Sequence, residues 1–244
     1  MDRSTPGLRL EFLMPPGREI SRIWRALRPI DHVFIRLIVG DVAMLAESPI
    51  DWTFLTTTVE FWDPQHAVFN FQGTELTPTV EEYTTLIQRL MPTQGILVPN
   101  HFAVIQSQLS VLLGISTKEV QRELDQGWDH GVRITWLLNW THLWALRPTA
   151  ESYQRYICHG FLLLIFETLL FLHALNLIEG VLAKVVLQAV EGHSYVKALL
   201  AETIRSLDYV RERYSSSDRD GRFPARTKTM IIRAYSSLDD NRPT

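Results

Sequence analysis

The sequence predicts a mainly α-helical, multi-helix globular domain around a central hydrophobic helix, with one small β-hairpin. The run 160–178 is apolar on nearly every side, so a helix there must be buried. On both sides of this run, apolar residues recur at intervals of three and four, which is the spacing of amphipathic helices. One segment, 67–76, instead alternates apolar and polar residues around a glycine, and this pattern is typical of a hairpin.

Composition and charge place the chain among ordinary globular proteins. Of its 244 residues, 46% are hydrophobic and 21% are charged. The net charge of −3 does not favour any particular class of binding partner. We expect a flexible lead at 1–17, a single helical domain at 18–214 and a disordered polar tail at 215–244. The single cysteine, Cys158, excludes an internal disulfide, and no secretory signal opens the chain, so we expect a location inside the cell.

The first helix is predicted directly after the lead. Apolar side chains recur at i, i+3 and i+7 from Ile20, and Pro29 ends the helix. Such a helix presents its polar residues on the opposite side. Those residues could contact nucleic-acid phosphates, or they could simply be solvated. Three arginines make up this side, which we name the arginine face: Arg18, Arg22 and Arg25.

The following helices are predicted from the same spacing and from capping residues. A second helix covers 32–46, and a third starts at Ser48-Pro49. Capping-box spacing at Thr79 and Glu82, and again at Ser116 and Glu119, marks two more helix starts. Further helices are predicted over 102–113, 181–190 and 196–210, and through a stripe of Trp136, Trp140 and Trp144. The predicted apolar side of the second helix is Val33, Phe34, Leu37, Ile38, Val42 and Leu45.

No motif in the sequence carries a recognised catalytic chemistry, since Walker-type, G-x-G-x-x-G, G-x-S-x-G and H-E-x-x-H patterns are absent. We therefore expect no enzyme, with no catalytic, cofactor-binding or metal-binding residue. Cys158 and His159 could pair as nucleophile and base, but neighbours on a helix point about 100° apart, which favours a buried structural cysteine. Lys184 and Lys197 lie on polar helix faces, unlike a desolvated Schiff-base lysine.

Two polar residues of the central run, Glu167 and His173, are candidates for a buried functional role. A carboxylate in a hydrophobic helix has a raised pKa unless it is paired, and such groups cluster at functional sites. The alternative is that Glu167 is hydrogen-bonded to an arginine, tryptophan or tyrosine of a neighbouring helix. The tryptophan stripe likewise could stack bases, or form a packing seam.

The central run could reach across a bilayer, but we expect it to be the core of a soluble domain. The helix predicted after it has an apolar face of its own, which would have nothing to cover if the central run lay in lipid. No membrane partner is therefore expected.

Two segments resemble a known family. The run FWDPQHAVFNFQGTELTPTVEEY at 61–83 resembles the signature of plant mobile domain proteins and their retroelement-associated plant relatives. In these an F-W-x-P, an F-x-F and an E-L-x-P-T-x-E-E-Y run follow in that order. The run AETIRSLDYVRERY, followed by Gly221-Arg222-Phe223, is similar to a later family stretch, so the resemblance covers roughly 33–223. Phe171-Leu172 stands where the family has Phe-Pro, and the short polar end resembles a C-terminal truncation.

The resemblance implies a helical domain with no established catalytic residues. Some relatives are called aminotransferase-like, but we find no cofactor lysine here. The leading hypothesis is a non-enzymatic interaction domain of a transposon-associated plant protein, nuclear and linked to silencing of transposable elements, with an unknown protein partner. The alternatives are weak, sequence-independent nucleic-acid binding through the basic ends, and an enzyme that uses Glu167.

Overall fold

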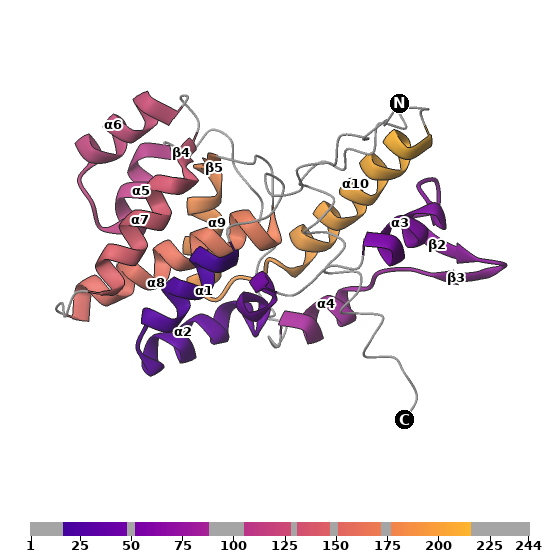
Figure 1. Cartoon of the computed structure of the whole chain (residues 1–244), viewed down its shortest axis with the longest axis horizontal. Helices are drawn as coiled ribbons and strands as arrows, with labels where there is room; N and C mark the ends of the chain where they lie inside the picture. Colours follow the sequence, from indigo (N-terminus) through magenta and orange to yellow (C-terminus); the bar gives the residue numbers. More distant parts are fainter. Residues whose placement is uncertain are drawn as a thin grey trace, which may run out of the picture.

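The computed structural model describes residues 17–47, 52–87, 105–127, 131–146, 151–171 and 177–215, and it is mainly α-helical, as predicted (Figure 1). The predicted lead and tail lie outside these residues, apart from Gly17 and Ser215, and so do Ser48-Pro49 and His173. The α-helices are α1 (Gly17–Ala26), α2 (Pro29–Val39), α3 (Trp52–Glu60), α4 (Val80–Ile87), α5 (Ile105–Leu113), α6 (Thr117–Gly127), α7 (Ile134–Ala145), α8 (Glu151–Ile165), α9 (Val181–Val190) and α10 (Val196–Ser215).

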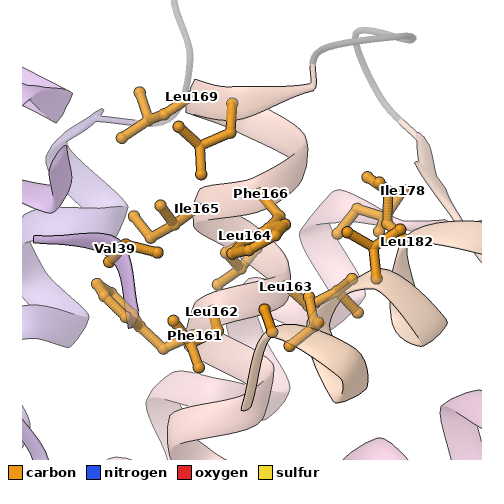
Figure 2. Close-up of a cluster of buried hydrophobic side chains, with 14 of the residues drawn as sticks. Val39, Phe161, Leu162, Leu163, Leu164, Ile165, Phe166, Leu169, Ile178 and Leu182 are labelled. Carbon is orange, nitrogen blue, oxygen red and sulfur yellow. The ribbon is translucent and has the colours of Figure 1, made fainter. Parts of the chain in front are cut away.

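The core is built around α8, as the central-helix prediction requires. Every side chain from Phe161 to Phe166 is fully buried. Figure 2 shows α8 between Val39 of α2 on one side and Ile178 and Leu182 on the other. Within the part of the chain that the structure describes, no helix combines the length and hydropathy needed to cross a membrane.

The prediction of one helix over 160–178 is wrong at its C-terminal end. After α8 the chain makes one π-helical segment, η3 (Phe166–Leu170), in which the N–H of Phe171 bonds to the carbonyl of Phe166. The strand β5 (Leu177–Glu179) then pairs antiparallel with β4 (Gly131–Arg133), with Ile178 opposite Val132. Ile178 of the strand is as buried as the side chains of α8, and an apolar run by itself does not distinguish a helix from a strand.

The predicted hairpin is confirmed. Strands β2 (Val68–Phe71) and β3 (Thr74–Leu76) are joined by Gln72 and Gly73, whose φ of 53° and 92° fit a type I′ turn. A short strand, β1 (Trp62–Asp63), pairs with β2, and it was not predicted. The hairpin projects from the body of the molecule beside α10 (Figure 1). The indole Nε1 of Trp62, in β1, donates a 2.8 Å hydrogen bond to Asp208, which ties the three-stranded sheet to α10.

Local capping predictions also hold. Thr79 and Glu82 form the predicted box at the start of α4: the Thr79 N–H donates to the Glu82 carboxylate (2.9 Å) and the Glu82 N–H to the Thr79 hydroxyl (3.2 Å). At the start of α6 the Ser116 hydroxyl accepts from the N–H of Glu119 (3.3 Å). These interactions span three residues, so the sequence contains everything they need.

The second predicted helix differs from the structure in extent and orientation. It is α2, which ends at Val39, followed by the 3-10 helix η2 (Val42–Glu47). Gly40 separates them with φ of 59°, and a Cβ there would lie 2.5 Å from the carbonyl oxygen of Ile87. Val33 and Leu37, predicted on the apolar side, instead face solvent.

Candidate functional site

Three large apolar side chains stand exposed in a row on α2. Ile30, Val33 and Leu37 retain 68%, 58% and 70% of their accessible surface. Their spacing of i, i+3 and i+7 places them on one side of the helix, along about two turns. Single exposed apolar residues are normal on proteins, but a contiguous patch marks an interaction site or an aggregation risk. We name these three residues the α2 stripe.

The opposite side of α2 fixes the helix to the core. Ile35, Ile38 and Val39 are buried there. The hydroxyl of Tyr195, in the turn before α10, donates a 2.7 Å hydrogen bond to the carbonyl oxygen of Ile38. That carbonyl belongs to the last turn of α2, where helical carbonyls have no partner within the helix. The α2 stripe therefore lies on a helix whose opposite side is anchored to the core.

A second anchor lies at the start of α2. The carboxylate of Asp31 accepts bonds from the backbone N–H of Arg28 (3.1 Å) and from its guanidinium (3.0 Å). Asp31 is buried, and α2 packs on α8. Because a buried carboxylate requires such partners, this pair fixes the first turn of α2.

One flank of the α2 stripe is basic and aromatic. Arg36 follows Val33 by three residues, so it borders the stripe. Its side chain is half exposed, pairs with Asp41 at 3.0 Å, and lies 5.6 Å from the centre of the Trp24 ring of α1. The Trp24 ring in turn stacks on His32 at 4.1 Å, so α1 and α2 are joined along this flank.

The arginine face predicted from the sequence lies on α1, on the helix next to this flank. All three of its members are exposed. The pKa of His142 on α7 is lowered, mainly because the ring is partly buried and in addition because the positive charge of Arg22 lies nearby. The structure thus confirms that the three arginines are solvent-facing, and it leaves their binding role as a prediction.

Glu167 is enclosed in the core. It lies in the π-helical segment η3, its side chain has no solvent exposure, and its carboxylate accepts a 3.3 Å hydrogen bond from the backbone N–H of Glu179 in β5. The sequence suggested a side-chain partner on a neighbouring helix, whereas the bond described here comes from strand backbone. In this structure the Glu167 carboxylate lies in the core and links η3 to β5, and a functional role for it stays a prediction.

Cys158 and His159 do not form a nucleophile and base. Burial, and then the neighbouring Asp31 carboxylate, raise the pKa of the Cys158 thiol to about 12, so it stays protonated and unreactive at neutral pH. The ring Nδ1 of His159 lies 3.0 Å from the carbonyl oxygen of Leu112, which can only accept, so Nδ1 carries the proton. Burial lowers the pKa of His159. The predicted structural cysteine is confirmed as buried.

The tryptophan stripe of α7 is a packing seam. Its members are partly buried and pack against the main core. Trp140 and Trp144 have ring centres 6.3 Å apart, and Gly160 of α8 approaches so closely that a Cβ there would lie 2.8 Å from the Trp140 ring. Lys184 is partly exposed and Lys197 exposed, as their positions on polar faces predicted.

Sequence reasoning missed the α2 stripe, although a signal was present. The segment PIDHVFIRLIV carries apolar side chains on more sides than one buried face requires. Such a helix is either wholly buried or leaves an apolar side uncovered. Here Ile35, Ile38 and Val39 face the core, and the remaining side is the α2 stripe.

Comparison with known protein families identifies a relationship. The model of a family described as Domain of unknown function (DUF7745) matches residues 25–217, which include α2, the α8 core and the hairpin. No curated protein and no solved structure matches significantly.

Proposed function

The chain belongs to the DUF7745 family, and from that premise we propose that it is a non-enzymatic interaction module that binds a partner protein through the α2 stripe. The observation that carries this proposal is the row of three apolar side chains, each more than half exposed, on a helix anchored to the core from its other side. Because this apolar surface lies on an anchored helix, a partner can cover it with little loss of backbone conformational entropy in this chain.

The size of the surface bounds how much it can contribute. Burying an aliphatic side chain is worth about 1.5–3 kcal/mol, so covering the remaining surface of these three contributes roughly 3–6 kcal/mol. Association costs about 4–15 kcal/mol in lost freedom. The α2 stripe therefore serves as the centre of an interface, and contacts around its rim must supply the rest.

Proximity labelling in cells tests the proposal. The chain fused to a labelling enzyme is compared with Leu37→Glu, which places a charge at the C-terminal end of the α2 stripe, and with Val111→Glu as a matched control. Val111 is an apolar residue of α5 that is 63% exposed, so the control adds the same charge elsewhere. We expect Leu37→Glu to lose specific labelled proteins that Val111→Glu keeps. Identical labelled sets for all three proteins would refute the proposal.

A second candidate function, weak nucleic-acid binding, is supported by the exposure of the whole arginine face. Three arginines can neutralise only a few phosphates, so binding should be weak, sequence-blind and strongly salt-dependent. Replacing Arg18, Arg22 and Arg25 by alanine should flatten the salt dependence measured with a labelled duplex. Tight binding that survives the triple change would place the contact elsewhere.

The resemblance to plant mobile domain proteins supports two further proposals, a nuclear location and an association with transposable elements. Both rest on the segment at 61–83, which builds the hairpin and the start of α4. A fluorescent fusion of the full chain tests the location directly: exclusion from the nucleus would contradict it.

A further inference from the structure

We infer that the α2 stripe takes an amphipathic helix of a partner protein whose acidic side chains run along one flank, against Arg36. The inference rests on the proposed function and specifies the chemistry of the partner. It depends on the shape of the stripe and on the charge beside it.

The shape of the surface favours a helix. Its three residues lie in a single row, and the row from Ile30 to Leu37 spans seven residues, or about 10 Å at the helical rise. A second helix packed along α2 covers such a row with apolar side chains at the same spacing of three and four residues. An extended strand would offer side chains on one side at every second residue instead, a poorer match to two helical turns.

The charge of the flank favours carboxylates. The ion pair with Asp41 engages Nε of Arg36, and the guanidinium has further N–H groups that can receive a carboxylate from outside. The contact with the Trp24 ring holds Arg36 in place, so less freedom is lost on binding. The surrounding segment 17–41 holds five arginines against three carboxylates, although the whole chain has a net charge of −3.

A second copy of this chain, with its α2 antiparallel to the first, is a poorer occupant. Two α2 helices packed antiparallel about a two-fold axis would place the same flank of each on the same side of the pair. Arg36 would then share a flank with Arg36 of the other copy, and like charges disfavour this arrangement. A partner with a basic flank is disfavoured for the same reason.

Two synthetic peptides test the inference with the full chain. Both have about 18 residues, enough for a helix, with leucines at helical spacing, and they differ only in carrying glutamates or lysines along one flank. Binding is followed by fluorescence anisotropy at low salt. We expect the glutamate peptide to bind about fivefold more tightly, and the difference to shrink as salt is added. Arg36→Gln should reduce the preference and Arg36→Glu should reverse it, with thermal unfolding as the check that each variant is folded.

The outcomes separate this inference from the proposed function. Equal binding of both peptides, abolished by Leu37→Glu, would overturn the acidic partner and leave the interaction surface standing. The inference would also be overturned if neither peptide binds, or if Arg36→Glu leaves the preference between the peptides unchanged. The labelling experiment decides the proposed function independently of both results. A dimer in sedimentation velocity that Leu37→Glu dissociates would assign the stripe to a second copy and overturn the acidic partner.

Discussion

The hydroxyl of Tyr195 is a small group on which the position of α2 depends. It is fully buried and donates a 2.7 Å hydrogen bond to the Ile38 carbonyl in the last turn of α2. Tyr195→Phe keeps the ring, which packs on Phe166 with ring centres 4.8 Å apart, and removes only the hydroxyl. We therefore expect the packing to persist while one buried carbonyl loses the donor that this hydroxyl supplies.

The expected loss follows from that carbonyl. Leaving a buried acceptor without its donor costs about 1–3 kcal/mol. For a chain of this size, each kcal/mol lowers the melting temperature by about 2–4 °C, so Tyr195→Phe should melt roughly 2–12 °C lower. Denaturant unfolding should show a lower midpoint with an unchanged slope, because the surface exposed on unfolding is the same.

A matched variant separates the hydrogen bond from the general effect of removing a hydroxyl. Tyr156 of α8 makes an edge-on ring contact with His159 and is only partly buried. Tyr156→Phe should change stability by less than about 0.5 kcal/mol. Equal melting temperatures for Tyr195→Phe and the wild type would refute the claim that this bond anchors α2.

Three other changes test the account at separate places. Gly40→Ala should cost about 2–4 kcal/mol in chemical unfolding, because its φ of 59° is strained for alanine and the added Cβ meets the Ile87 carbonyl; wild-type stability would disprove the close approach. Burial lowers the pKa of His159 below 6.5, so the folded state binds fewer protons and loses stability as pH falls below 6.5. His159→Gln should therefore reduce the loss of stability by up to about 1.4 kcal/mol per pH unit. The measurement is the free energy of unfolding at pH 7 and at pH 5. The same dependence of that free energy on pH in the variant and the wild type would contradict the prediction. Glu167→Gln should be nearly neutral and Glu167→Lys should cost about 3–5 kcal/mol, whereas similar stabilities for the two would show that the site is not closed.

The parts of the fold that sequence predicted are those that depend on neighbours in the chain. The Thr79–Glu82 box spans three residues, the glycine-centred turn of the hairpin involves only the neighbours Gln72 and Gly73, and the apolar content of the central run by itself requires burial. The strand pair β4–β5 was missed because it joins segments more than forty residues apart, as the pairing of Val132 with Ile178 shows.

The candidate site was harder to predict because its orientation is set by tertiary packing. The spacing of apolar residues in α2 is compatible with burying either side of the helix. Packing of Ile35 and Ile38 against the core, the bond from Tyr195 and the turn at Gly40 decide which side faces solvent. The arginine face of α1 was found from sequence, since that helix has only one apolar side.

The central claim, that a partner protein covers the α2 stripe, is tested most directly by photo-crosslinking inside cells. A photoreactive amino acid replaces Val33 in the middle of the stripe, or Val111 on α5 as the control, since both side chains are more than half exposed. After illumination we predict a discrete covalent adduct to another protein from position 33 and none of that mass from position 111. The same adducts from both positions, or none from position 33, would contradict the account.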